Sequence, residues 1–161
     1  MSSTTRNGDT TFTTPSDREI VITRSFDAPR ELVFAAFTQP EHLPNWMGPA
    51  IFTMVTCEID LRVGGTYRWA WSGSDGAVMA MGGTYLEVSP PERIVAVESF
   101  DDFPGETRNT IVFTEQDGRT TATVTVLYDS PEARDATLAS GMKDGMTEGY
   151  ERLEELLRSL A

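Results

Sequence analysis

The residues of this chain that could perform chemistry are few, and most of them have a structural explanation. The sequence holds one histidine, His42, and one cysteine, Cys57. A single cysteine excludes an intrachain disulfide, and a single histidine provides poorly for zinc. We expect His42 to lie exposed on the surface and Cys57 to be a buried, unreactive thiol within a strand. The sequence therefore predicts no metal site, no cofactor and no assembled catalytic set.

Three carboxylates, Glu58, Glu87 and Glu98, lie inside segments with strand character. A carboxyl group that points into an apolar cavity has a raised pKa and can serve as a general acid or base. We expect these three to face solvent or to pair with arginines, such as Arg62, Arg68 and Arg93. An acid–base role for one of them stays open.

The strongest candidate for a binding site is a wall of large side chains. Tyr67, Trp69 and Trp71 alternate along one segment and therefore share one face of a strand. Methionines and a tyrosine alternate in the same way along the next segment, which a tight turn joins to the first. Such polarisable and deformable side chains suit an apolar ligand. The residues that we expect to line a cavity are Phe37, Trp46, Met47, Tyr67, Trp69, Trp71, Met79, Met81, Tyr85, Met142, Met146 and Gly149. A solid core built from the same residues is the alternative.

The elements that must position this wall follow a simple order. An alternating strand over 19–26 precedes a helix over 29–38 and a second short helix that begins at Pro40. Six strand-like segments follow with short turns between them, which predicts an antiparallel meander. These segments are 52–60, 65–72, 77–88, 93–100, 107–115 and 120–128. We interpret the pair Gly82-Gly83 as a bend or bulge that curls the sheet.

The last thirty residues predict a single long helix over 130–160. Ser130-Pro131-Glu132 is typical of a helix N-terminus, and the apolar residues from Leu138 to Leu160 form one stripe. Three glycines interrupt this helix at a spacing of four residues: Gly141, Gly145 and Gly149. We expect Gly149 to border a cavity and Gly145 to pack closely on the sheet.

Composition predicts one ordinary globular domain over 18–161 after a flexible leader over 1–17. The net charge of −12 argues against nucleic acid as a partner. No apolar run is long enough to span a membrane, and the first residues lack the apolar core of a signal peptide. We expect a cytoplasmic protein that is a monomer or a weak homodimer.

Four motifs give the chain a family resemblance. They are Phe26-Asp27-Ala28-Pro29, Trp46-Met47-Gly48-Pro49, the run 60–65 and the run 85–93. Together with the glycines and Tyr150 of the C-terminal helix, they resemble the Hsp90 ATPase activator homologue family, over about 19–160. This family belongs to the START-like, helix-grip (SRPBCC) superfamily. The resemblance and the element order predict an α+β fold, in which a seven-stranded curved antiparallel sheet surrounds the long C-terminal helix.

Three functions are compatible with this resemblance. The leading hypothesis is a small-molecule binding protein that holds a lipid-like or aromatic ligand between the sheet and the last helix. The first alternative, by analogy with the family's name, is a cofactor of a chaperone. The second is an enzyme of the cyclase or dehydratase type that uses a strand carboxylate or a tyrosine. Because no catalytic set is visible, we favour binding over catalysis.

Overall fold

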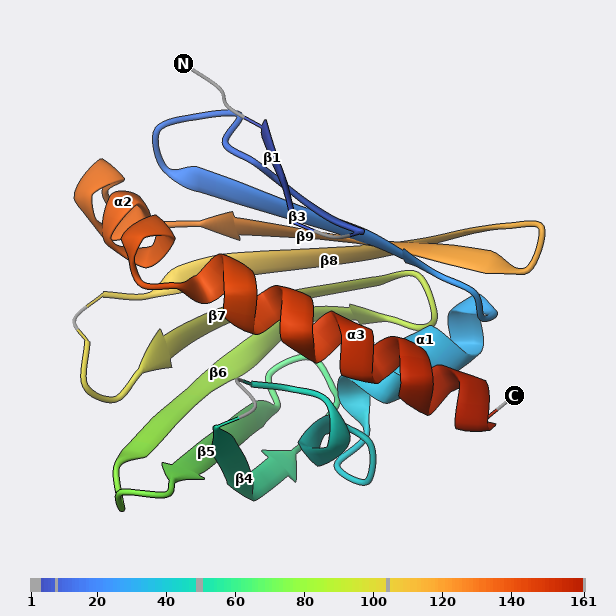
Figure 1. Ribbon diagram of the computed structural model, residues 1–161, viewed down its shortest axis with the longest axis horizontal. Coiled ribbons are helices and arrows are strands. Elements are labelled where there is room, and N and C mark those ends of the chain that lie inside the picture. The colour runs from blue at the N-terminus through green and yellow to red at the C-terminus, as the bar shows by residue number, and fades with distance from the viewer. Residues whose placement is uncertain (1–3, 8, 49–50, 104, 161) are drawn as a thin grey trace.

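The computed structural model describes residues 4–7, 9–48, 51–103 and 105–160, and these form one twisted sheet with helices on its inner face (Figure 1). The helices are α1 (Arg30–Thr38), the short 3-10 helix η1 (Leu43–Asn45), α2 (Pro131–Ala139) and α3 (Met142–Leu160). The strands are β1 (Thr4–Asn7), β2 (Thr10–Thr13), β3 (Glu19–Phe26), β4 (Phe52–Ile59), β5 (Thr66–Gly73), β6 (Val78–Ser89), β7 (Arg93–Phe100), β8 (Thr107–Gln116) and β9 (Arg119–Leu127).

All neighbouring strands are antiparallel, in the order β1-β2-β3-β9-β8-β7-β6-β5-β4. The meander from β4 to β9 and its pairing with β3 confirm the predicted antiparallel architecture. The described part of the chain holds nine strands rather than seven, because residues expected in a flexible leader form β1 and β2. Phe12 of β2 is only 2% exposed, so this hairpin contributes to the core.

The C-terminal segment is two helices, not one. Ser130 caps α2 as predicted, because its hydroxyl accepts a hydrogen bond from the Ala133 amide at 3.1 Å. The helix ends at Ala139 with Ser140 as its C-cap, and Gly141 has a φ of +84°, a left-handed conformation that glycine adopts without strain. The chain turns there, and α3 runs across the inner face of the sheet (Figure 1).

The inner face of the sheet and the apolar stripe of α3 enclose the core. On β3, the side chains of Ile20, Ile22 and Phe26 point inward and are at most 2% exposed, as strand alternation requires. From α3, Tyr150, Leu153 and Leu157 meet them. Leu160, predicted as part of the stripe, is 40% exposed at the last residue of α3. No helix within the described residues is long and apolar enough to cross a membrane.

Candidate functional site

The inner face of β5 and β6 carries the predicted row of aromatic rings. Tyr67, Trp69 and Trp71 of β5 are all less than 10% exposed, and Tyr85 of β6 joins them. The ring centroids of Tyr67 and Trp69 are 4.6 Å apart, those of Tyr67 and Tyr85 are 4.9 Å apart, and those of Trp69 and Trp71 are 6.4 Å apart. We call these four residues the aromatic wall. It is a continuous surface, as the alternation of both strands predicts.

A carboxylate lies at one end of this wall. Glu98 of β7 faces the Gly83 position of β6, and Gly83 in turn faces Tyr67 of β5. The Tyr67 hydroxyl donates a hydrogen bond of 2.5 Å to Glu98 Oε2. The Tyr67 ring therefore reaches over β6 to contact a side chain two strands away.

Gly83 is the residue that permits this contact. A Cβ atom at this position would lie 2.5 Å from Cζ and Oη of Tyr67 and 2.6 Å from the carbonyl oxygen of Val97. Any other residue would collide with the ring and with the neighbouring backbone. Gly82 and Gly83 pair in regular register with β5 and β7, whereas the register shifts of β6 fall between Tyr85 and Glu87. The glycine pair was expected to mark a bend or bulge, and the bulge is wrong at this position. At Gly83 the missing side chain makes room for the Tyr67 ring.

The surroundings of Glu98 change its protonation. Burial raises the pKa of Glu98 from 4.5 to about 7, although hydrogen bonds from Tyr67 and Asn109 partly offset the effect. The same burial, with the Glu98 charge, raises the pKa of the Tyr67 phenol far above its ordinary range. The residue itself is half-buried, so one side of Glu98 remains accessible. Glu98 is thus the carboxylate for which the acid–base possibility stays open.

The three tryptophans differ in how their indole N–H groups are satisfied. Trp46 donates to the Ala36 carbonyl at 2.9 Å, and Trp71 donates to the Met47 carbonyl at 3.2 Å. Trp69 Nε1 is buried and finds no hydrogen-bond partner among the described residues. A buried donor without a partner costs about 1–3 kcal/mol. An unpartnered indole N–H within a row of aromatic rings is unusual in a core. A hydrogen-bond acceptor placed beside Trp69 would remove this cost.

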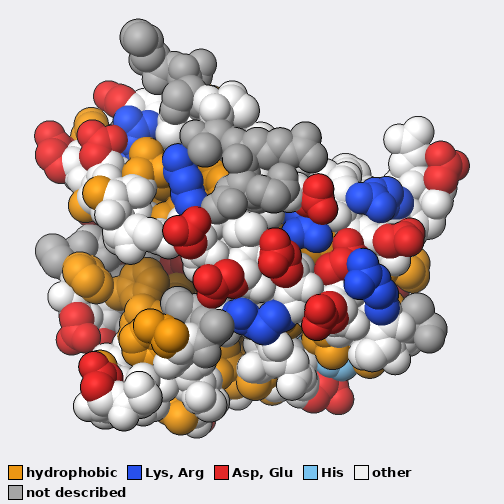
Figure 2. Space-filling model, in the orientation of Figure 1, with side chains coloured by type: hydrophobic (Ala, Val, Ile, Leu, Met, Phe, Trp, Pro, Cys, Tyr) orange, Lys and Arg blue, Asp and Glu red, His pale blue; other side chains and the backbone are white. Residues whose placement is uncertain are grey.

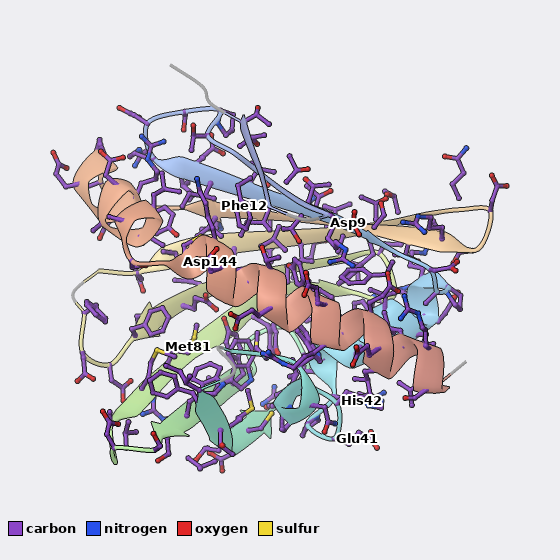
Figure 3. All side chains as sticks on the ribbon, in the orientation of Figure 1. Asp9, Phe12, Glu41, His42, Met81 and Asp144 are labelled. Atoms are coloured by element: carbon purple, nitrogen blue, oxygen red, sulfur yellow. The ribbon has the colours of Figure 1, made fainter. Side chains whose placement is uncertain are left out.

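Two methionines of β6 lie beside the aromatic wall, because Met81 and Met79 pair in register with Trp69 and Trp71. Met81 of β6 is buried, and it lies on the side of the sheet that α3 crosses (Figure 3). Met79 of β6 and Met142 and Met146 of α3 are half-buried and pack against the same core. Figure 2 shows hydrophobic side chains gathered over β6 and β7, beside the N-terminal half of α3. Flexible thioether side chains therefore contribute to this side of the interior.

The predicted lining residues do not all assemble at the wall. Phe37 and Trp46 belong to a second aromatic cluster, in which the Phe37 ring lies 4.9 Å from Trp46 and 5.2 Å from Phe113. Tyr150 of α3 closes this cluster, 6.0 Å from Trp46. Met47 is half-buried beside this cluster, and its carbonyl oxygen accepts the hydrogen bond from the Trp71 indole N–H. The cluster is filled by its own rings and forms the solid core under α1 and α3.

Gly149 was expected to border a cavity, and the structure contradicts this. A Cβ atom at Gly149 would lie 3.0 Å from the carbonyl oxygen of Trp46, which is backbone and cannot move aside cheaply. The same carbonyl accepts a hydrogen bond from Arg152 at 3.0 Å. The glycine lets α3 approach the chain just after η1, so it serves close packing rather than open space.

The remaining candidates for chemistry are His42, Cys57, Glu58 and Glu87. His42 is half-buried at the start of η1 rather than exposed, and burial raises the pKa of the half-buried Cys57 thiol, which disfavours the reactive thiolate. Glu58 is exposed, and Glu87 pairs with Arg93 at 3.2 Å, as expected. Within the described ranges, no three His, Cys, Asp or Glu residues cluster closely enough to hold a metal ion.

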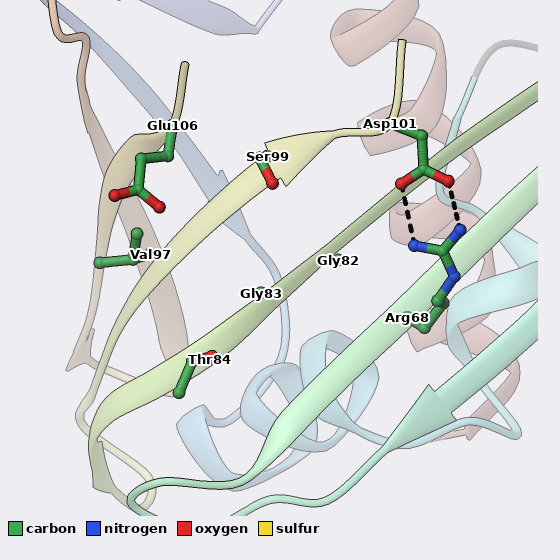
Figure 4. Close-up of a pocket in the computed structure, with 8 residues that line it drawn as sticks. All are labelled: Arg68, Gly82, Gly83, Thr84, Val97, Ser99, Asp101 and Glu106. Carbon is green, nitrogen blue, oxygen red and sulfur yellow. Dashed lines mark hydrogen bonds and ion pairs between the residues drawn. The ribbon is translucent and has the colours of Figure 1, made fainter. Parts of the chain in front are cut away.

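A shallow hollow of about 280 Å³ lies on the outer face of the sheet (Figure 4). Arg68 of β5 donates to both carboxylate oxygens of Asp101 there, and Gly82, next to Gly83, forms part of the floor. Because strand neighbours alternate, Arg68 points away from the face that carries Tyr67 and Trp69. This hollow is separate from the aromatic wall. An exposed ion pair of this kind adds little stability.

Comparison with solved structures assigns the fold. A protein from Rhodobacter sphaeroides is 32% identical over 93% of this chain and 99% of its own, with a TM-score of 0.88. A protein from Mycobacterium smegmatis is 26% identical over 96% of this chain and 97% of its own, with a TM-score of 0.80. An Hsp90 activator from Plasmodium falciparum is 24% identical over 68% of this chain and 72% of its own, with a TM-score of 0.52, and shows similarity of fold alone. No curated protein matches the chain.

The curved antiparallel sheet and the long C-terminal helix that crosses its inner face define a helix-grip protein of the START-like class. The model of one family, described as activator of Hsp90 ATPase homolog 1-like protein, matches residues 27–158. The chain belongs to this family, as its motifs predicted.

Proposed function

We propose that this protein binds a small apolar molecule that contains an aromatic ring and a hydrogen-bond acceptor. The ligand would lie between the aromatic wall and α3. The observation that carries the proposal is the indole N–H of Trp69, which is buried among aromatic rings and has no hydrogen-bond partner in the described part of the chain. A ligand oxygen placed there would satisfy the donor while its ring stacks on the wall.

The chemistry of the wall supports an aromatic ligand in particular. Aromatic pairs with centroids 4.5–7 Å apart gain about 0.5–1.5 kcal/mol beyond the burial of their area. Tyr67 and Trp69 are tilted by 35° to each other and Tyr67 and Tyr85 by 43°, so their faces form a shallow angled surface. A flat ligand can take the place of methionine side chains on this surface.

Space for the ligand comes from movement of methionines. Met79, Met142 and Met146 are half-buried, and each has several rotatable bonds. Displacing them costs less than displacing a fully buried branched side chain. A wall of fixed rings opposite movable thioethers is an arrangement suited to ligands of more than one shape.

Replacement of Trp69 tests this proposal. The probe is prodan, a neutral naphthalene ketone whose fluorescence rises in apolar surroundings. Trp69→Ala should weaken prodan binding by about 1–3 kcal/mol, the loss of one buried aromatic anchor. Trp69→Phe keeps a ring but removes the donor, and should weaken binding by about 1 kcal/mol, the net worth of one hydrogen bond. Fluorescence titration gives both affinities.

Val78→Ala is the matched control, since Val78 of β6 is 60% exposed. This variant should bind prodan as the wild type does. Thermal melting of each variant verifies that the fold is intact. If prodan binds wild type and Trp69→Ala with equal affinity, or does not bind wild type at all, the ligand site is not at the aromatic wall.

A cofactor role toward a chaperone and a cyclase- or dehydratase-like activity rank behind ligand binding. The chaperone-cofactor role is compatible with the family's description and with the fold shared with the Plasmodium Hsp90 activator. The cyclase- or dehydratase-like activity is compatible with the hydrogen-bonded pair of Tyr67 and Glu98, which could act as an acid or base. The expectation of a cytoplasmic monomer or weak homodimer is part of the same proposal.

A further inference from the structure

Glu98 is a half-buried carboxylate beside the core, and it has no cationic partner among the described residues. Its described neighbours on β5 and β8 are neutral hydrogen-bond donors, Tyr67 at 2.5 Å and Asn109. No lysine or arginine of the described chain forms an ion pair with Glu98. Arg108 of β8 is near in the register but is exposed on the outer face. Charges that are removed from water are normally paired, so this partly buried carboxylate is a candidate to bind a cation.

Aromatic faces lie beside the carboxylate. The rings of Tyr67, Tyr85 and Trp69 stand next to one another at the end of the wall that Glu98 closes. The face of an aromatic ring attracts a cation, and the attraction reaches about 2 kcal/mol or more when water is excluded. Aromatic rings next to a single carboxylate form a site for a positive charge on an apolar body. A small, strongly hydrated inorganic cation fits such surroundings poorly.

We propose that the preferred ligand carries an organic ammonium group, which lies against Glu98 and the faces of Tyr67 and Tyr85. This inference rests on the proposed ligand site at the aromatic wall and names the chemical class of its ligand. The ammonium neutralises the carboxylate, Tyr67 and Asn109 keep donating to it, and the apolar body of the ligand stacks toward Trp69. The acceptor for the Trp69 indole belongs to the same ligand.

Protonation of Glu98 competes with the cation. Burial raises the pKa of Glu98 to about 7, so near neutral pH a proton must leave before the ammonium group binds. The groups that face Glu98 from neighbouring elements are Tyr67 of β5, Tyr85 of β6, Asn109 of β8 and Tyr128 after β9. Burial also raises the pKa of each tyrosine, so these phenols stay neutral near pH 7. The affinity for a permanent cation should therefore rise about tenfold per pH unit up to pH 7 and then level off.

The experiment compares two probes of nearly equal shape, phenyltrimethylammonium and its neutral counterpart tert-butylbenzene. The binding of each is followed by tryptophan emission of the full chain between about pH 5 and pH 8. At pH 8 the cation should bind wild type about 10-fold more tightly than the neutral probe. Glu98→Gln, which keeps the hydrogen-bonding shape without the charge, should abolish that preference and its pH dependence. The control Glu58→Gln, at an exposed strand glutamate, should retain both.

The outcomes separate the two proposals. If the neutral probe binds wild type as tightly as the cation, or if Glu98→Gln keeps the cation preference, the ammonium inference is overturned while the ligand site stands. If neither probe binds wild type or Glu98→Gln, and prodan also fails to bind, the ligand site itself is wrong. Thermal melting of Glu98→Gln shows whether the variant is folded. Should it not fold, the pH profile of wild type alone decides, because a flat profile for the cation contradicts a role for Glu98.

Discussion

Glu154→Ala should lower the free energy of unfolding by about 3–5 kcal/mol, a large share of the stability of a domain of this size. Glu154 of α3 forms an ion pair of 3.6 Å with Arg24 of β3, and the two side chains are 12% and 5% exposed. Removing the carboxylate leaves a guanidinium within the core. The guanidinium keeps its Nε hydrogen bond to the Ser25 carbonyl at 3.3 Å, whereas its Nη1 has no partner among the described residues, so its charge is only partly compensated.

The same carboxylate also fixes the end of β3. Glu154 Oε2 accepts a hydrogen bond from the backbone N–H of Asp27 at 3.3 Å. The Arg24 guanidinium lies 5.2 Å from the centroid of the Phe26 ring. One side chain of α3 thus connects the helix to both a charge and a backbone group of the sheet. Urea unfolding of Glu154→Ala measures the loss.

Two further variants separate charge from packing. Glu151→Ala, at an exposed position of α3, should change stability by less than about 0.5 kcal/mol. Replacing both partners by apolar residues, Arg24→Met with Glu154→Leu, should recover much of the stability lost in Glu154→Ala. A single Glu154→Ala variant as stable as Glu151→Ala would show that the ion pair contributes nothing.

Gly83→Ala should weaken both the fold and the ligand site. The added Cβ would lie 2.5 Å from the Tyr67 phenol and 2.6 Å from the Val97 carbonyl, so ring and backbone must both shift. Overpacking of this kind costs about 1–3 kcal/mol. The shift of the ring breaks the hydrogen bond from the Tyr67 hydroxyl to Glu98. The affinity for prodan should therefore fall at least as much as in Trp69→Phe. Urea unfolding and fluorescence titration measure the two effects.

Tyr67→Phe serves as the comparison for Gly83→Ala. It removes the hydroxyl that donates to Glu98 and leaves the ring on the wall. Its unfolding free energy should fall by about 1 kcal/mol, less than that of Gly83→Ala. A Gly83→Ala protein with the stability and prodan affinity of wild type would show that Tyr67 does not need the space above Gly83.

Local patterns predicted the sheet well. The six strand segments that form the meander lie within one residue of β4 to β9 at each end, because turn residues separate them and alternation marks their faces. The hairpin of β1 and β2 was missed, since its threonine-rich, polar composition is also that of a flexible leader. The β propensity of threonine around Phe12 was the signal that could have indicated a strand.

The chemistry of the site could not be predicted to the same extent. Tyr67, Trp69 and Trp71 alternate with polar or small residues, so their shared face follows from sequence. Glu98 follows an apolar run from Ile94 to Val97 in which both faces are hydrophobic, and no pattern assigns its side chain to the interior. Its contact with Tyr67 depends on the register of three strands, which tertiary pairing sets.

The break between α2 and α3 has a similar explanation. Gly141 fits either a tolerated glycine within a helix or a residue just past a helix C-terminus, and both readings agree with the apolar spacing around it. The environment of Gly149 depends on how α3 meets the chain after η1, a tertiary contact that helix periodicity does not contain.

The most direct test of the ligand site is the nuclear magnetic resonance spectrum of the three indole N–H groups. Trp46 and Trp71 donate to backbone carbonyls, whereas Trp69 has no partner among the described residues, so the three resonances report different states. On titration with prodan, the Trp69 proton should move downfield as it gains an acceptor, while the Trp46 proton stays close to its starting position. A Trp69 resonance that does not move when prodan is saturating would contradict a ligand site at the aromatic wall.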